Sequence, residues 1–233
     1  MDQLLQQKCP INTSIELNSI SLQTMLSVLT LLQEVNELLE KKAYHKKNLK
    51  EKILETTITL VEKEGFQNVS TRKIAKELGI SSTAIYRHYP SLEDLFSKVI
   101  IRLSTILAKK LNQNINEKFS AKSCLEKVGI DFVHFSMEKT HFFNLLFLSP
   151  YSPKRIFESE TTLIEFPTIS LFLQLVNRMI KENKLAIEPP SLFVQLWSFI
   201  LGYSMLVREG NVLFEQSVIQ HTIQCLIPKE ATQ

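Results

Sequence analysis

The sequence predicts an all-α protein, and three observations support this fold class. Only 5 glycines and 8 prolines occur in 233 residues, so long segments contain no residue that breaks a helix. Apolar residues recur at intervals of three and four, which is the period of a helix with one buried face. No segment alternates apolar and polar residues as a half-buried strand does. With 44% hydrophobic residues, the chain has enough apolar surface for a large core.

Residues 1–45 form an N-terminal extension that carries one amphipathic helix. The first 20 residues, rich in Gln, Asn and Ser, are expected to be a poorly ordered lead-in, after which Ser21 caps a helix that runs to about Tyr44. Its apolar face is wider than the seam of a coiled coil, although Asn36 stands in a coiled-coil position. Docking on the body or on a partner subunit is favoured, and self-association or a disordered appendage are the alternatives.

A basic cluster follows this helix. The net charge of the chain is only +3, so a nucleic-acid surface has to be a local patch. The cluster is either a solvated linker or a source of sequence-independent attraction to phosphates. Its members are Lys41, Lys42, His45, Lys46, Lys47, Lys50 and Lys52.

The next helix is expected to end at Gly65, and residues Thr71–His88 then fit two helices that cross over a three-residue turn. Ile74 gives the first of these helices its inward face, together with Leu78. Ala75 is small enough to let the second helix approach closely. Gly79 supplies the turn.

The second helix of this pair is expected to start at Ser82, after Ile80 has fixed the turn in the core, and to be anchored by Ile85. A hairpin buried in a core has no need of a polar outer face, whereas a helix that enters a major groove does. The sequence therefore predicts a helix-turn-helix DNA-binding domain over residues 46–98 and a helical regulatory and dimerisation domain over residues 99–233. The outward residues are Ser82, Thr83, Ala84, Tyr86 and Arg87.

Three motifs lie between Lys46 and about Leu103. They read Ile-Leu-x-Thr-Thr-x-x-Leu-Val-x-x-x-Gly-Phe, Ser-Thr-Arg-Lys-Ile-Ala-x-x-Leu-Gly-Ile-Ser and Ile-Tyr-Arg-His-Tyr-Pro-Ser-Leu-Glu-Asp-Leu-Phe. In this order they resemble the N-terminal domain of tetracycline-repressor (TetR) family regulators. The resemblance implies a sequence-specific DNA-binding transcriptional regulator.

The resemblance also implies a role for each exposed residue. Thr71 would cap its helix and touch a phosphate, and Tyr86 and His88 would hold the DNA backbone. Arg87 could contact a base or a phosphate; if one side chain dominates base recognition, we expect it to be Arg87, because arginine can bind guanine O6 and N7 together. Arg72 belongs to the expected DNA-binding set, and three further residues would face base edges, namely Ser82, Thr83 and Ala84.

Leu92 departs from the family pattern, which commonly has a phosphate-binding lysine at this position. A leucine makes no such contact, so one contact to the DNA backbone is missing. Lys46 and Lys47, just upstream of the domain, are our hypothesis for what replaces it.

The C-terminal domain is expected to begin along a long helix opened by Ser91, and its aromatic residues mostly indicate core packing. Breaks are expected at Pro150 and Pro153, at Pro189 and Pro190, and at Gly210. The remaining helices are expected at Lys122–Lys139, His141–Leu148, Glu160–Lys184, Ser191–Arg208 and Val212–Cys225.

The resemblance implies that helices 191–208 and 212–225 form a homodimer, with two DNA-binding domains about 34–36 Å apart on a palindromic site. The dimer prediction agrees with the apolar run Leu192, Phe193, Leu196, Phe199, Ile200 and Tyr203. A small apolar or aromatic effector would bind between the middle helices. Its candidate contacts are His134, His141, Phe142, Phe143, Phe172, Asn177 and Trp197.

Other chemistries find no support in the sequence. Cys9, Cys124 and Cys225 are far apart and form no Cys-x-x-Cys pair, so we expect reduced thiols in a cytoplasmic protein, without disulfides or zinc. His134 and His141 lack a carboxylate or cysteine at ligand spacing, and no metal or cofactor is expected. We find no signal peptide, no membrane span, no nucleophile elbow and no phosphate-binding glycine loop, so the chain is not expected to be an enzyme.

Two functions remain in competition. The first is a repressor that leaves its operator when a small effector binds. The alternative is an effector-independent architectural or protein-recruiting DNA-binding factor on the same fold. A C-terminal domain that encloses a cavity of a few hundred Å³ would favour the first, and a solidly packed one the second.

Overall fold

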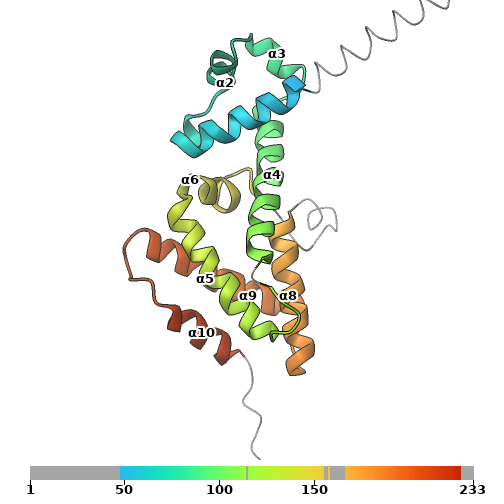
Figure 1. Ribbon diagram of the computed structural model, residues 1–233, viewed down its shortest axis with the longest axis vertical. Coiled ribbons are helices and arrows are strands. Elements are labelled where there is room, and N and C mark those ends of the chain that lie inside the picture. The colour runs from blue at the N-terminus through green and yellow to red at the C-terminus, as the bar shows by residue number, and fades with distance from the viewer. Residues whose placement is uncertain (1–47, 114, 155–156, 158–165, 227–233) are drawn as a thin grey trace, which may run out of the picture. The chain divides into compact units, whose positions relative to one another are not determined.

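The computed structural model describes residues 48–113, 115–154, 157 and 166–226, and every regular element among them is helical (Figure 1). This confirms the predicted all-α fold. The predictions for residues 1–45, and for Lys46 and Lys47, fall outside the described residues. Residues 52–233 group into one compact unit.

The DNA-binding domain begins with a helix over residues 48–64, which ends at Gly65 as predicted, with a φ of 80°. A short 3₁₀ turn, η1 (Phe66–Asn68), leads to α2 (Thr71–Leu78) and α3 (Ser82–Tyr86). We call residues 52–91 the reading head. Its core is built from apolar residues that share one interior, including Ile53, Val61, Ile74 and Ile85.

Helix α4 (Leu92–Asn112) joins the reading head to the rest of the chain. Ser91 caps it as predicted, because the Ser91 hydroxyl accepts a hydrogen bond of 3.0 Å from the Asp94 amide. Its buried residues run from Leu95 to Leu111, so a single buried face continues through both parts. The predicted boundary between residues 98 and 99 falls inside this helix.

The remaining helices form what we call the body, together with the C-terminal part of α4. Helix α5 is central, since it packs against α8, α9 and α10 and also contacts α4 and α6 (Figure 1). The elements are α5 (Ala121–Glu138), α6 (Thr140–Phe143), the π-helical turn η2 (Asn144–Leu148), α8 (Pro167–Asn183), α9 (Pro189–Arg208) and α10 (Gln216–Cys225).

Prolines stand at the start of two helices. Helix α8 begins at Pro167, since Phe166 before it has a non-helical φ of −121° and ψ of 74°. The predicted helix start at Glu160 lies outside the described residues. Pro189 and Pro190 open α9 and do not merely separate helices, because a proline has no amide hydrogen to lose in the first turn.

A tyrosine hydroxyl explains the late start of α10, at Gln216 and not at Val212. The Glu215 amide donates to the Tyr203 hydroxyl at 2.7 Å, and that hydroxyl donates to the Glu215 carbonyl at 3.1 Å. These bonds hold the residue before α10 in an extended conformation, with a φ of −130° and ψ of 118°. A side chain of α9, that of Tyr203, therefore fixes the connection between α9 and α10.

Helix α9 is apolar on two faces. The run expected at the dimer interface lies mainly inside the chain's own core, because Leu192, Phe193, Leu196, Ile200 and Tyr203 are all buried. This corrects the expectation for those residues. Among the described helices, α9 is long and apolar enough to cross a membrane by length and composition, yet 39% of its most apolar window is already buried. Its exposed apolar residues are Val194, Met205 and Leu206.

Candidate DNA-binding site

Helix α2 is fixed at its first turn by Ser70, one residue earlier than expected. The Ser70 hydroxyl accepts a hydrogen bond of 3.3 Å from the Lys73 amide, and Thr71 is the first helical residue. The expectation that Thr71 caps the helix is therefore wrong, because the capping side chain is the one that reaches the third helical amide. The hydroxyl of Thr71 is left to face outward.

The turn between α2 and α3 depends on Gly79, as predicted. Gly79 adopts the left-handed conformation, with a φ of 64° and ψ of 32°, and its amide donates to the carbonyls of Ala75 and Lys76. A Cβ at this position would meet nothing within 4 Å, so it is the backbone conformation that requires glycine. Ile74 and Ala75 are buried as expected, whereas Ile80 is only half-buried.

Helix α3 begins at Ser82 as predicted, and Ser81 supplies its cap by accepting from the Ala84 amide at 3.3 Å. Ile85 is 1% exposed and anchors the helix in the core. Thr83 lies on the exposed face, whereas Ser82 and Ala84 are half-buried. Among the expected base readers within α3, Thr83 is thus the fully exposed one.

Arg87 is exposed and follows the last residue of α3. It therefore lies about one turn from Thr83, at the end of the helix opposite to the one that enters a major groove in helix-turn-helix proteins. From this end of α3, only a side chain as long as that of arginine would reach a base edge.

The hydroxyls of Thr71 and Tyr86 meet across the two helices, at a distance of 3.3 Å. They come from residues 15 positions apart, and the Tyr86 side chain is 49% exposed. Arg72 is exposed next to Thr71, and His88 is half-buried. The fold thus brings two of the expected phosphate-binding groups into one exposed pair.

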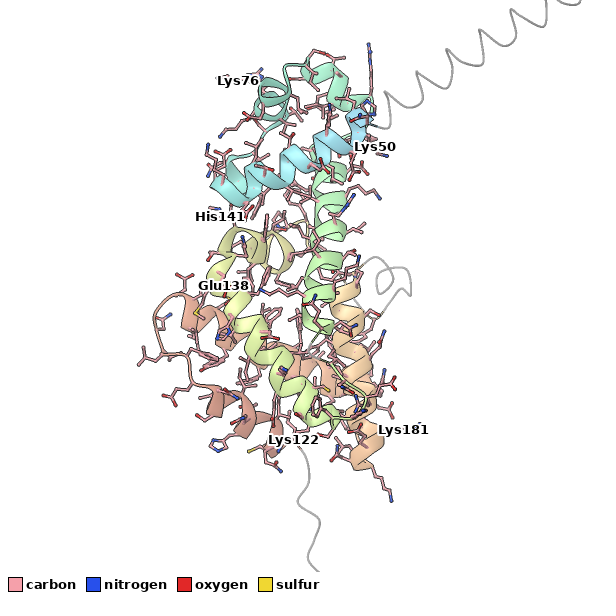
Figure 2. The ribbon with its side chains drawn as sticks, viewed as in Figure 1. Lys50, Lys76, Lys122, Glu138, His141 and Lys181 are labelled. Carbon is pink, nitrogen blue, oxygen red and sulfur yellow. The ribbon has the colours of Figure 1, made fainter. Side chains whose placement is uncertain are left out.

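Lys73 was not expected to matter, yet it ties the first helix to α2. Its ammonium is ion-paired with the Glu64 carboxylate and lies 3.5 Å from the Asn68 carbonyl. Glu64 precedes the η1 turn and Asn68 is its last residue, so Lys73 ties α2 to the end of the first helix and to the turn between them. No spacing rule in the sequence indicates a pair nine residues apart across a turn. Lys76, in contrast, is exposed at the surface of α2 (Figure 2).

The start of α4 shows the effect of the departure at Leu92. Leu92 is half-buried in the first position of the helix, and Glu93 and Asp94 follow in the first turn. These carboxylates interact favourably with the positive end of the helix dipole but add negative charge where the family pattern has a lysine. This end of α4 therefore offers no cation to a phosphate.

The residues expected to bind an effector do not gather at one site. Phe143, Phe172 and Trp197 belong to one aromatic cluster, whose rings are in direct contact, with centroids 5.6 Å apart for Phe172 and Trp197. Phe132 and Phe147 link Phe143 to that cluster at centroid distances of 5.6 and 5.3 Å.

The other four expected residues lie elsewhere. His134 packs on Phe214 with ring centroids 4.9 Å apart, and Asn177 is exposed on α8. His141 and Phe142 line a surface pocket of about 240 Å³ near Glu62. These residues do not line one cavity with the aromatic cluster.

Two other pockets lie along α4. A pocket of about 180 Å³ lies between α4 and the segment after η2, and it is lined by Ile100, Tyr151 and Phe166, among others. A wider one of about 400 Å³ lies beside Ala108, Pro167 and Leu171. Over the described part of the chain, no group of three or more His, Cys, Asp or Glu side chains is placed to hold a metal ion.

Comparison with known proteins finds relatives for the helix-turn-helix segment. Residues 53–99 match the family model described as bacterial regulatory proteins of the tetR family. The chain is 33% identical over 86 residues to the nucleoid occlusion factor SlmA of Vibrio atlanticus, a match that covers 36% of this chain and 42% of that protein. The SlmA of Shewanella pealeana is 35% identical over 78 residues, covering 33% and 40%. The matched segment thus spans about two fifths of these relatives.

Solved structures share the fold over a longer stretch. A TetR-family regulator from Vibrio parahaemolyticus has a TM-score of 0.55 at 16% identity and covers 76% of this chain and 95% of its own. The regulator FadR from Bacillus subtilis, solved with stearoyl-CoA, has a TM-score of 0.56 at 13% identity, covering 76% and 96%. The helix-turn-helix segment of this chain is thus similar to the tetR family of bacterial regulatory proteins, and the longer chain shares the fold of these solved structures.

Proposed function

We propose that this protein is a sequence-specific DNA-binding transcriptional regulator of the cytoplasm that places α3 in a major groove. The observation that carries the proposal is the division of α3 into two faces. Ile85 holds one face in the core, while Thr83, Tyr86 and Arg87 stand exposed on a helix that is capped and fixed by its turn. Base edges and phosphates are the partners that such a polar helix surface fits.

Contacts to phosphates are assigned to the groups around the base readers. The Thr71 and Tyr86 hydroxyls lie 3.3 Å apart, so we propose that both bind the same phosphate. Arg72 and His88 would add phosphate contacts next to this pair. Arg87 would bind either a base or a phosphate. Lys46 and Lys47 would replace the missing cation at Leu92.

A second copy of the chain is proposed to cover the exposed apolar face of α9. Val194 is 51% exposed, Leu206 47% and Leu213, in the following loop, 85%. Exposed aliphatic side chains on one helix and its adjoining loop indicate a surface that is buried in an assembly. A two-fold dimer through α9 and α10 would present two reading heads to a palindromic operator.

We further propose that a small effector releases the protein from its operator. The FadR neighbour was solved with stearoyl-CoA, a ligand with a long apolar acyl chain, which supports a ligand site in a fold of this kind. In this chain, the pocket beside Tyr151 is our preferred site. The Tyr151 ring contacts Phe96 and Phe66 of the reading-head region at centroid distances of 4.9 and 6.0 Å. A ligand that moved this ring would act on the head directly.

The alternative is a DNA-binding factor that works without an effector. Two observations favour it. The rings of the aromatic cluster are in direct contact, with Trp197 between 5.4 and 5.8 Å from four neighbouring rings, so that part of the body is already filled. The matched relatives are named nucleoid occlusion factors. A screen for ligands that raise the melting temperature and release DNA separates the two functions.

Selection of bound duplexes from a random pool tests the DNA-binding proposal itself. The full chain is expected to enrich two inverted copies of one short half-site. Enrichment of no motif would contradict sequence-specific binding. Enrichment of a single, unrepeated half-site would contradict the dimer and leave the role of α3 intact.

A further inference from the structure

Among the described residues, an aromatic and a polar contact hold the reading head besides the covalent link through α4. One is aromatic: Phe66 of the head contacts Phe96 of α4 and Tyr151 of the body, and Phe96 and Tyr151 contact each other. The other we call the polar head–body contact, and it consists of Glu62, Lys139 and His141. Figure 2 shows His141 at this border, beside the end of the first helix.

The polar head–body contact holds the end of the first helix from two directions. Lys139 Nζ lies 2.5 Å from Glu62 Oε1, and His141 Nδ1 lies 2.9 Å from the Glu62 carbonyl oxygen. Because a carbonyl only accepts, His141 Nδ1 is the donor. The imidazole also lies against Gly65, where a Cβ would stand 3.6 Å from His141 Cδ2. The contact therefore fixes the chain just before η1 and α2.

The same short segment is tied into the body on its other side. Phe143, two residues after His141, is buried in the aromatic cluster. The Arg208 guanidinium stands 5.3 Å from the centre of the Phe143 ring, and its Nη1 donates to Asn144 Oδ1 at 2.6 Å. Arg208 is the last residue of α9, the helix with the exposed apolar face. The segment 139–144 thus connects the end of α9, the proposed dimer helix, to the reading head.

We propose that Lys139 and His141 are positioning residues that set which spacing of half-sites the protein accepts. This inference rests on the proposed function. A head held only by α4 and the aromatic contact keeps more freedom to rotate about that helix, so two heads would tolerate several spacings. The further attachment at Glu62 restricts the orientation of each head, and hence the separation of the two copies of α3 in the dimer.

The ion pair is suited to a positioning role because removing it does not threaten the fold. The side chains of Lys139 and Glu62 are 47% and 48% exposed, and pairs with this exposure contribute little to folding stability. Their loss should therefore appear in the geometry of binding and not in the melting temperature.

The test measures dissociation constants for the full chain on duplexes whose two selected half-sites are separated by spacers that differ by one base pair. The wild type is expected to prefer one spacing. In the Lys139→Ala/His141→Ala variant, the ratio of affinities between the best spacing and its neighbours is expected to fall by about fivefold or more. Affinity for a duplex with a single half-site should stay within about twofold of the wild type, since no DNA-facing group changes.

Two further variants serve as controls. Lys110→Ala removes a comparably exposed ion pair within the body, to Glu138 at 3.7 Å, and should leave the spacing preference unchanged. The charge swap Glu62→Lys with Lys139→Glu restores a pair of opposite charges, and it should recover most of the preference that Lys139→Ala loses. A folded double variant with an unchanged preference would overturn the inference, as would a wild type that binds all spacings equally. A wild type that binds no DNA would instead refute the proposed function.

Discussion

Arg87 shows how much the role of one side chain depends on where its helix ends. It is exposed immediately after α3, and its guanidinium can bind guanine O6 and N7 together, which a threonine or serine hydroxyl cannot do. At this position it is also within reach of the DNA backbone. A base contact changes specificity, whereas a phosphate contact changes all affinities alike.

Replacing Arg87 by Ala is expected to weaken binding to the selected operator by about 5- to 150-fold, which corresponds to about 1–3 kcal/mol for a lost bidentate base contact. Binding to random-sequence DNA should change little. Fluorescence anisotropy at one salt concentration measures both, with Lys181→Ala at the far end of α8 as a control. Equal losses on the two DNAs would assign Arg87 to a phosphate.

Leu92 leads to a gain-of-function prediction. Leu92→Lys is expected to strengthen binding to every DNA sequence, because it returns a cation to the start of α4, beside Glu93 and Asp94. The plot of log affinity against log salt should become steeper by about one unit. Leu92→Met, which adds no charge, is the matched control. An unchanged slope in the lysine variant would show that this end of α4 does not face DNA.

At the scale of single residues, the sequence predicted which residues of a helix face the core, because these recur with the helical period. It did not predict the contacts that residues make across a turn. The inward positions of Ile74, Ala75 and Ile85 follow from spacing alone, and the structure confirms them. The cap of α2 was assigned one residue late, to Thr71 instead of Ser70, because adjacent Ser and Thr residues are equally good caps by type. The ion pair between Lys73 and Glu64 could be recognised only in the folded structure.

At the scale of elements, the turn between α2 and α3 is the most constrained point of the reading head. Gly79→Ala is expected to lower the free energy of unfolding by about 1 kcal/mol, since a Cβ in the left-handed region is strained even where space is open. Urea unfolding measures the change. Gly79→Asn should cost less, because asparagine tolerates this region. A neutral alanine variant would mean that the turn relaxes without cost.

The exposed face of α9 carries the second element-scale prediction. Leu206→Glu is expected to convert the dimer to a monomer, because it places a charge within the proposed interface at a residue that is exposed in the single chain. Sedimentation velocity distinguishes the two states. Ile106→Glu, at a similarly exposed aliphatic residue on α4, should leave the dimer intact. A dimeric Leu206→Glu variant would place the interface elsewhere.

Helix boundaries in the body show why the sequence alone was insufficient there. Periodicity located every α-helix among the described residues, but the late start of α10 depends on the Tyr203 hydroxyl, which reaches Glu215 only in the folded chain. The apolar run on α9 was assigned to a partner, and most of it is buried in the chain itself. A helix with two apolar faces does not reveal which face its own core will use.

At the scale of the whole molecule, the DNA-binding region was predicted more fully than the effector site. A helix-turn-helix is specified by residues close together in the sequence. An effector site is formed by side chains from several helices, and the expected set is divided between the aromatic cluster, the surface of α8 and the border with the reading head. Composition indicated aromatic residues in the body but not which of them pack together.

The central claim is that the exposed face of α3 reads bases. The most direct measurement compares the motifs that the wild type and a Thr83→Ala/Arg87→Ala variant select from one random pool. The account predicts that the wild type selects a palindromic motif. The variant is expected to fold and still bind DNA, but to select sequences with most of the base preference lost. The same motif enriched equally by both proteins would contradict it.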